Sequence, residues 1–322
     1  MPVKISVVIP TYRRPALLRQ CLAALAAQHF DPAGYEVVVV SDGYDAATEA
    51  VVREAPGGHP AVRYHHLSCK RGPAAARNLG WQRAAGPLVA FTDDDCLPDP
   101  GWLRGFWEAY RGETEAAFSG RVRVPVPTPP TDYEKSVTGL QTADFVTANC
   151  LCTRAALQRI GGFDERFSMA WREDSDLEFK LIRAGIPIGY KADAEVVHPV
   201  RAAPWGVSIR EQKKSLFNAL LYRKHPELYR QKVQPGPRWD YYRTVLCLLL
   251  GVAGLVVGVP VLAWAALAGW LLLTARFAAA RLAGTSRQAG HVLEMIVTSA
   301  VIPVACVCWR LYGAWKYKVF FL

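Results

Sequence analysis

The sequence LVAFTDDD, at residues 88–95, decides the fold and the functional site expected of this chain. Apolar residues with strand character run directly into three carboxylates, and two prolines close behind them turn the chain. Ligands of open α/β sheets bind at the carboxyl ends of the strands, so these acids are expected at the mouth of a site. Adjacent carboxylates repel one another unless a cation offsets them, and hard divalent ions take oxygen ligands. The pattern therefore favours a metal-binding site over its alternative, a solvated acidic turn.

Apolar strand-like segments alternate with helical segments through the N-terminal part of the chain. Residues 3–9, 36–40 and 62–67 have strand length and character, and helical patterns follow the first and third of them. Alternation of this kind, with wholly apolar strands, is typical of a parallel sheet covered on both faces. We therefore predict an α/β, Rossmann-like fold with a mostly parallel sheet flanked by helices.

The turn after the first strand disfavours two common nucleotide-binding classes. It reads PTYRRP at residues 10–15 and lacks the G-x-G-x-x-G fingerprint, and the chain has no G-x-x-x-x-G-K loop. Dinucleotide-binding domains and P-loop NTPases need those glycines so that phosphate groups can approach the backbone. The chain is therefore not expected to be an NAD-dependent enzyme or a P-loop NTPase.

Two apolar runs near the C-terminus have the length of membrane segments. Residues 245–280 as one straight helix would be about 54 Å long, against a hydrocarbon core of about 30 Å. Gly258 and Pro260 offer a natural break. We predict a helical hairpin over roughly 242–280 and an interfacial or re-entrant helix over roughly 291–315.

The expected organisation is a catalytic domain at residues 1–230 and a membrane-associated region at residues 231–322. The alternative for the second region is a buried helical subdomain of a soluble protein. The membrane-scale length of the apolar runs favours the membrane interpretation.

Positive charge gathers around the apolar runs. Seven basic residues and one acidic residue follow Asp240, so this segment carries +6 of the net charge of +10. The excess flanks apolar segments and forms no basic stripe, so nucleic acid is not the expected partner. It agrees with the positive-inside rule and with attraction to anionic lipid. We predict attachment to the cytoplasmic (inner) membrane with the catalytic domain in the cytosol, and the eight cysteines, interpreted as reduced, agree.

Six motifs, in this order along the chain, resemble the signatures of family-2 glycosyltransferases. They are IPTYRR (9–14), VSDG (40–43), RGPAAARN (71–78), FTDDD (91–95), GGFDE (161–165) and EDSDL (173–177). Each motif alone is weak, but six in the family's order are specific, and the resemblance covers roughly residues 3–225. It implies a GT-A fold and transfer of a sugar from a nucleotide-sugar donor that is UDP-, GDP- or dTDP-linked.

The resemblance also implies which residues bind the nucleotide. Thr11 and Tyr12 would line its pocket, and Asp42 would hydrogen-bond the base. Arg71 and Arg77 would lie near the nucleotide or its phosphates. For Asp42 the alternative is a turn residue before a glycine, and for Arg77 it is a cation on a helix surface.

The acidic triplet corresponds to the D-x-D motif of the family. Asp93 would face the ribose and share the metal, Asp95 would bind the metal on the diphosphate, and Asp94 would touch the donor sugar. His198 follows a strand-like segment at the position where the family often has a histidine near the metal, and a purely structural histidine is the alternative. The implied cofactor is Mg²⁺ or Mn²⁺.

The helix expected over residues 172–184 begins with acids that are candidates for catalysis. The family typically inverts the anomeric configuration, so a carboxylate must accept the proton of the attacking hydroxyl. We expect Asp174 to be this general base, with Glu173 as second choice. The alternative is that these acids merely complement the positive end of the helix dipole.

The acceptor is expected to be membrane-associated, with a lipid-linked saccharide of cell-surface glycan synthesis as the first choice. Processive synthases of the family carry Q-x-x-R-W, whereas residues 234–239 read QPGPRW, one residue longer and stiffened by two prolines. Transfer of a single sugar is therefore favoured. The alternatives are a polyprenyl-phosphate sugar synthase, a sugar-1-phosphate nucleotidyltransferase and a sugar-binding protein without activity.

Overall fold

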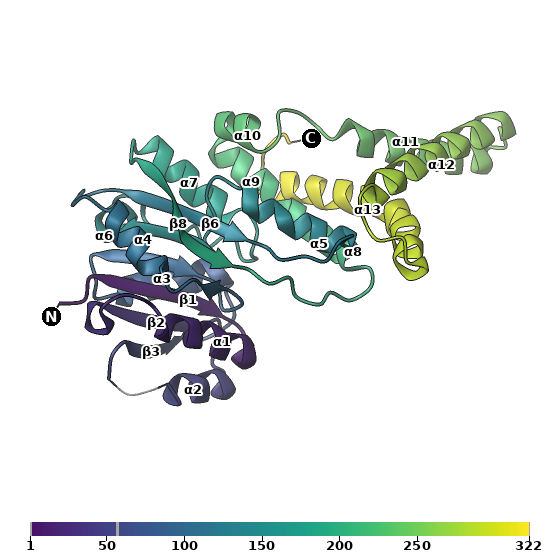
Figure 1. Ribbon diagram of the computed structural model, residues 1–322. Coiled ribbons are helices and arrows are strands. Elements are labelled where there is room, and N and C mark those ends of the chain that lie inside the picture. The colour runs from purple at the N-terminus through teal and green to yellow at the C-terminus, as the bar shows by residue number, and fades with distance from the viewer. Residues whose placement is uncertain (1, 56–57, 322) are drawn as a thin grey trace. The chain divides into compact units, whose positions relative to one another are not determined.

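The computed structural model describes residues 2–55 and 58–321, which fall into two compact units (Figure 1). The first unit comprises residues 1–125 and 138–200 and holds the sheet. The second comprises residues 126–137 and 201–322 and is built from helices. Residues 201–230 thus pack with the C-terminal helices, whereas the domain boundary predicted from sequence lies after residue 230. The boundary after residue 230, between a catalytic domain and a membrane-associated region, stays a prediction.

The first unit is organised around one mixed sheet of eight strands, in the order β3-β2-β1-β4-β7-β6-β8-β5. The first four of these are parallel, as are β6 and β8, whereas β7 runs antiparallel to both β4 and β6. The strands are β1 (Ile5–Thr11), β2 (Tyr35–Ser41), β3 (Ala61–His66), β4 (Leu88–Thr92), β5 (Leu97–Pro98), β6 (Ala117–Arg123), β7 (Asn149–Thr153) and β8 (Ile188–Val197).

Helices pack around this sheet, and their ends follow local sequence signals. Pro15 opens α1 at a position where its missing N–H costs nothing, Asp45 caps α2 through the Thr48 N–H, and Gly161 ends α6 in the left-handed region. The helices are α1 (Pro15–Ala26), α2 (Ala46–Arg53), α3 (Pro73–Arg83), α4 (Trp102–Ala109), α6 (Arg154–Ile160) and α7 (Glu173–Arg183), with 3₁₀ turns η1 (Pro32–Gly34) and η2 (Thr138–Thr142).

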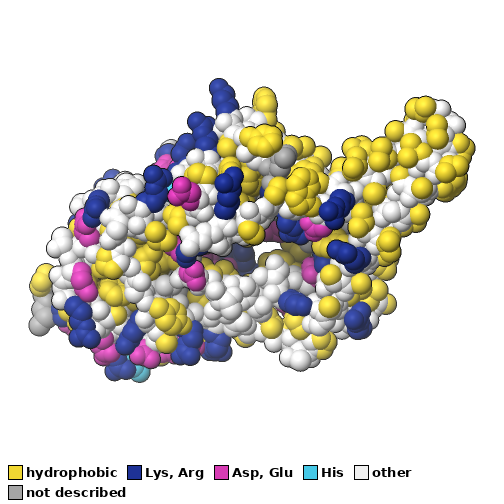
Figure 2. Space-filling model, turned by 90° about the horizontal axis from the view of Figure 1, so that it is seen from above, with side chains coloured by type: hydrophobic (Ala, Val, Ile, Leu, Met, Phe, Trp, Pro, Cys, Tyr) yellow, Lys and Arg dark blue, Asp and Glu magenta, His cyan; other side chains and the backbone are white. Residues whose placement is uncertain are grey.

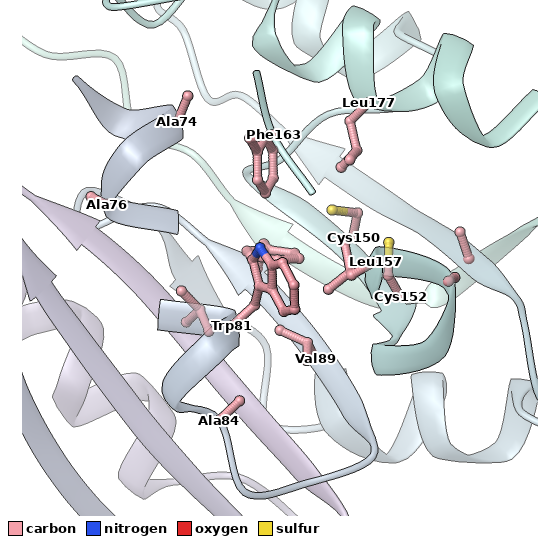
Figure 3. Close-up of a cluster of buried hydrophobic side chains, with 14 of the residues drawn as sticks. Ala74, Ala76, Trp81, Ala84, Val89, Cys150, Cys152, Leu157, Phe163 and Leu177 are labelled. Atoms are coloured by element: carbon pink, nitrogen blue, oxygen red, sulfur yellow. The ribbon is translucent and has the colours of Figure 1, made fainter. Parts of the chain in front are cut away.

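A buried cluster between α3, β4, β7 and α7 forms the core beneath the strand ends (Figure 3). Trp81 lies at its centre beside Phe163 and Val89, and Cys150 and Cys152 contribute their side chains as small apolar groups. Gly80 lets α3 approach the sheet, because a Cβ there would lie 2.3 Å from a methyl group of Val8. This packing fixes the position of α3, which carries Arg77.

Within its described residues, the second unit contains three helices long and apolar enough to cross a membrane, namely α11, α12 and α13. Helices α11 and α12 pack against each other, and a Cβ at Gly254 would lie 2.8 Å from the backbone of Ala263. Small residues allow such close approach between apolar helices. The helices are α5 (Asp132–Val137), α8 (Val207–Glu211), α9 (Leu216–Lys224), α10 (Pro226–Lys232), α11 (Trp239–Val257), α12 (Pro260–Leu282) and α13 (Ala289–Lys316), with the 3₁₀ turn η3 (Gln212–Ser215).

Candidate functional site

Parallel pairing brings the predicted site residues to one edge of the sheet. Thr11 at the end of β1 lies opposite Ser41 at the end of β2, so Asp42 follows directly beside it. Strand β4 runs parallel to β1 and delivers the acidic triplet at the same edge. Residues as far as 83 positions apart in sequence therefore meet because their strands end together.

The three aspartates of the triplet have different environments. The Asp93 carboxylate accepts a hydrogen bond from Arg77 Nη2 at 2.7 Å. Asp94 is turned inward and is 1 % exposed, and it accepts from the Thr11 hydroxyl at 2.7 Å and pairs with Arg14 Nη1 at 3.0 Å. The Asp95 carboxylate lies 3.4 Å from Arg14 and 3.8 Å from His198 Nε2.

These environments separate the acidities of the first two carboxyl groups. Burial raises the pKa of Asp93, but the nearby Arg77 and His198 outweigh it, so this pKa lies below its ordinary value. Burial raises the pKa of Asp94 to about 6, although Arg14 and the Thr11 hydroxyl act in the opposite direction. Asp93 is thus kept ionised at the edge of the sheet, while Asp94 holds Thr11 and Arg14 in place. The contact of Asp94 with a donor sugar stays a prediction.

Arg77 is the central cation of the site. It is 2 % exposed, and its guanidinium donates to Asp93 at 2.7 Å and to Glu173 at 3.1 Å. Burial alone would lower the pKa of Arg77, but the two carboxylates raise it above its ordinary value. The alternative of a helix-surface cation is therefore wrong, because the face of α3 that carries Arg77 is turned toward the strand ends. Arg77 connects the D-x-D motif to the start of α7.

Glu173 and Asp174 occupy the first turn of α7 in different ways. Burial raises the pKa of Glu173 to about 7, even though Arg77 lowers it, and this side chain is 4 % exposed. Asp174 is half-buried, and its carboxylate accepts the Ser175 N–H at 2.7 Å. Burial raises the pKa of Asp174 as well. Since Glu173 is engaged by Arg77, Asp174 has the freer carboxylate of the two.

Four side chains at this edge offer ligand atoms within 4.8 Å of one another, namely Asp93, Asp95, Cys96 and His198. Burial raises the pKa of the Cys96 thiol well above its ordinary value, so Cys96 is a neutral thiol and a poor ligand for a hard ion. Two carboxylates and an imidazole suit Mn²⁺ or Mg²⁺. The buried Nδ1 atom of His198 has no hydrogen-bond partner among the described residues, which leaves the imidazole free to turn toward an ion. The donor set fits the predicted cofactor.

The loop before α3 is held by Asp42. Its carboxylate accepts the backbone N–H of Arg71 at 2.6 Å and of Gly72 at 2.9 Å. Gly72 has φ +98°, and a Cβ there would lie 2.4 Å from the carbonyl oxygen of Ser168, so only glycine fits. Asp42 is buried and shapes this loop, and its predicted hydrogen bond to the base would use the remaining lone pairs.

Arg71 belongs to this loop, and Tyr12, which follows β1, contacts it through Lys70. The Lys70 ammonium sits 3.9 Å from the centre of the Tyr12 ring, and the exposed Arg71 side chain pairs with Glu165. Aromatic and cationic side chains in this arrangement can bind a base and a diphosphate. Their assignment to the nucleotide stays a prediction.

Sequence reasoning missed the roles of Arg14 and Asn78, although both lie inside the motifs that it singled out. Arg14 is the cation beside Asp94 and Asp95. Asn78 donates to the Phe163 carbonyl and to Glu165, both at 2.9 Å, and accepts the Phe163 N–H at 2.9 Å. It therefore fastens the GGFDE loop to α3. The signal that could have found these roles was the presence of several family motifs together. Motifs that contact each other in the fold restrict which residues each can contain.

The sequence of this region also matches a known family. Residues 6–163 match the sequence model described as Glycosyl transferase family 2. The chain contains a family-2 glycosyltransferase domain. The match begins in β1 and ends in the GGFDE loop, so it includes the strand ends, the D-x-D motif and Arg77.

Individual relatives agree with this family. The chain is 31 % identical over 212 residues to the pre-mycofactocin glycosyltransferase of Mycobacterium tuberculosis, covering 61 % of this chain and 43 % of that protein. It therefore spans less than half the length of this relative. It is also 31 % identical over 93 residues to the GalNAc(5)-diNAcBac-PP-undecaprenol beta-1,3-glucosyltransferase of Campylobacter jejuni, covering 29 % of each.

Solved structures confirm the predicted GT-A fold. A mannosyltransferase from Pyrobaculum calidifontis, in complex with GDP-Man and Mn²⁺, superposes with a TM-score of 0.61 at 20 % identity. The alignment covers 97 % of this chain and 89 % of that one. The α/β sheet with its C-terminal apolar helices is thus the architecture that the sequence predicts.

Loss of the buried cation should destabilise the first unit strongly. In Arg77→Met, the buried Glu173 and the partly buried Asp93 both lose their guanidinium partner, so the free energy of unfolding should fall by about 3–5 kcal/mol. Arg71→Met removes an exposed ion pair and should cost under about 1 kcal/mol. Chemical unfolding of both variants in detergent measures the difference, and equal losses would contradict the central role of Arg77.

Glu173 should make stability depend on pH. Its pKa is raised on folding to about 7, so its contribution to stability is fully present below its ordinary value of 4.5 and is lost as the pH rises through 7. Glu173→Gln keeps an oxygen acceptor for Arg77 but removes the titration. Between pH 4.5 and 7.5 the wild type should lose on the order of 2 kcal/mol more than this variant. Unfolding curves at several pH values test this, and parallel pH dependences would refute the assignment.

Proposed function

We propose that this chain is an inverting, metal-dependent glycosyltransferase that moves one sugar from a nucleotide-sugar to a lipid-linked saccharide. The observation that carries the proposal is the single guanidinium of Arg77, which joins Asp93 of the metal-ligand set to Glu173 beside the candidate base. The residues proposed to stabilise the leaving group and those proposed to accept the proton are thus connected through one side chain.

The residues at the strand ends suit a nucleotide-sugar donor. Asp93, Asp95 and His198 would hold Mg²⁺ or Mn²⁺, which as a Lewis acid stabilises the departing diphosphate. The nucleotide would lie against Thr11, Tyr12, Asp42 and Arg71, at the ends of β1 and β2 and in the adjoining loop. The solved mannosyltransferase with GDP-Man and Mn²⁺ supports this class of donor, with UDP-, GDP- and dTDP-sugars as candidates.

Asp174 accepts the proton in this proposal. The acceptor oxygen bonds to the anomeric carbon, the bond from that carbon to the diphosphate oxygen breaks, and the nucleoside diphosphate leaves with the electron pair. The hydroxyl proton passes to the Asp174 carboxylate, which is half-buried and whose pKa is raised by burial, so it is a stronger base than an ordinary aspartate. Glu173 and Arg77 position the first turn of α7 and do not take part in this proton transfer.

The acceptor and the location rest on the C-terminal helices and on the relatives. The name of the Campylobacter glucosyltransferase describes a saccharide linked to undecaprenol, which supports a lipid-linked acceptor here. Basic residues flank the apolar helices, which supports the cytoplasmic membrane with the catalytic domain, residues 1–230, in the cytosol. Residues 231–322 would then supply the membrane attachment.

The donor can be identified by slow hydrolysis of nucleotide-sugars. We expect the purified full chain to release one nucleoside diphosphate from UDP-, GDP- or dTDP-sugars with Mg²⁺ or Mn²⁺, and not with EDTA. Asp95→Asn should reduce the release by about 10²–10³-fold, because the leaving group loses its charge stabilisation. Asp99→Asn alters an exposed neighbour and serves as the matched control. Formation of a nucleoside triphosphate and a sugar-1-phosphate when pyrophosphate is added would instead indicate a nucleotidyltransferase, and absence of nucleotide binding would refute the proposal.

The role of Asp174 distinguishes two kinds of acceptor. A hydroxyl acceptor needs a base, so Asp174→Asn should lower the transfer rate by about 10²–10⁴-fold. A polyprenyl phosphate is already ionised and needs none, so full activity of Asp174→Asn would point to a polyprenyl-phosphate sugar synthase. Transfer to extracted lipid-linked acceptors, with the anomeric configuration of the product read by NMR, tests both the base and the inversion.

A further inference from the structure

Helix α13 is bound along its length by basic helices. The Glu294 carboxylate near its start accepts the Gly206 N–H at 2.7 Å, and the Tyr317 carbonyl at its end accepts from Arg223 Nη1 at 2.6 Å. These contacts lie about 34 Å apart along the helix. The segment from α8 through η3 to α9 packs against α13 between them and carries five basic residues: Arg210, Lys213, Lys214, Arg223 and Lys224.

This packing prevents α13 from crossing a hydrocarbon core. Charged side chains are costly at the centre of a bilayer, and helices α8 and α9 would have to enter it together with α13. The opposite face of α13 is apolar and exposed, with Leu293, Ile296, Val301, Leu311 and Trp315 each at least 41 % exposed. A helix with one exposed apolar face, and the other face against segments that carry basic residues, suits the plane of the membrane interface.

The α11–α12 hairpin has an apolar surface, but the part of each helix between its arginine and the turn is shorter than a hydrocarbon core is thick. Residues 244–275 contain no Asp, Glu, Lys or Arg, and hydrophobic side chains dominate the face of the hairpin that is seen in Figure 2. From the exposed Arg243 to the turn, α11 rises about 21 Å, and from the turn to the exposed Arg276, α12 rises about 24 Å. A hydrocarbon core is about 30 Å thick. The two arginines lie at similar distances from the turn and would meet anionic headgroups at the same level.

The tip of the hairpin is suited to hydrocarbon rather than to water. Val256, Val257 and Val261 are 81 %, 75 % and 82 % exposed, and residues 256–262 contain no polar side chain that could face a second aqueous phase. The N–H groups of Gly258 and Val259 both donate to the Gly254 carbonyl, and Pro260 has no N–H. Backbone donors satisfied within the turn remove the main cost of placing a turn in lipid.

We propose that the second unit attaches to the bilayer from one side only. The α11–α12 hairpin is re-entrant, with its tip inside the hydrocarbon core, and α13 lies in the interface on the side from which the hairpin enters. Length and composition permit three spanning helices. Three features argue against spanning: the basic segments along α13, the short helices of the hairpin and its apolar tip. All three helices would instead enter or lie on the bilayer from the same side. This attachment does not depend on which sugar the first unit transfers.

Site-specific labelling with a membrane-impermeant maleimide tests the proposal in membrane vesicles of both orientations. The exposed Cys69 of the first unit reports the side of the catalytic domain, and the exposed Cys308 is replaced by serine. Single cysteines are then introduced as Val257→Cys at the tip, Arg287→Cys before α13 and Lys318→Cys after it, the last two at exposed positions.

We expect Arg287→Cys and Lys318→Cys to react in the same vesicle orientation as Cys69. Val257→Cys should react at least tenfold less in either orientation and fully after denaturation in SDS. The protein itself leaves this position exposed, so only lipid can protect it. Labelling of Val257→Cys from the side opposite Cys69 would show a spanning hairpin. Labelling of Lys318→Cys from that side would show a spanning α13, and either result would overturn the proposal.

Discussion

The ion pairs of the buried Arg77 are the interaction on which the catalytic unit depends. A guanidinium taken out of water costs several kcal/mol unless carboxylates and hydrogen bonds offset the loss of hydration. Asp93 and Glu173 supply that compensation from β4 and α7, so three elements far apart in sequence are fixed to one another. The same contact keeps Asp93 ionised and holds the first turn of α7, which carries Asp174. The stability of this unit and the geometry of the proposed transfer site therefore depend on one side chain.

Several motif residues in this site hold loops rather than face open space. Asp42 binds two backbone N–H groups of the loop before α3, and Asn78 binds both the N–H and the carbonyl of Phe163. A buried side chain that satisfies backbone groups in this way rigidifies a loop at a modest net gain of about 1 kcal/mol per hydrogen bond. Preorganised loops lower the ordering cost of binding a flexible donor.

The second unit also contains a largely buried arginine that is held by an ion pair and hydrogen bonds. Arg281 at the end of α12 is largely buried and binds Asp132 at 2.8 Å and the Thr298 hydroxyl at 2.6 Å. This cluster ties α5, α12 and α13 together at the polar end of the hairpin, while the other end carries no charge. The hairpin is thus polar at one end and apolar at the other, as the proposed attachment to a bilayer requires.

The sequence by itself determined the α/β class, the family, the strand that delivers the acidic triplet and the hairpin break near Gly258. These features depend on local patterns: apolar runs, glycine and proline positions, and the order of motifs. Only the tertiary structure decided that Arg77 is buried between Asp93 and Glu173, that Asp94 turns inward to Thr11 and Arg14, and that α13 runs beside basic helices. Such contacts depend on which elements become neighbours in space, and the order of residues along one strand or helix does not contain that information.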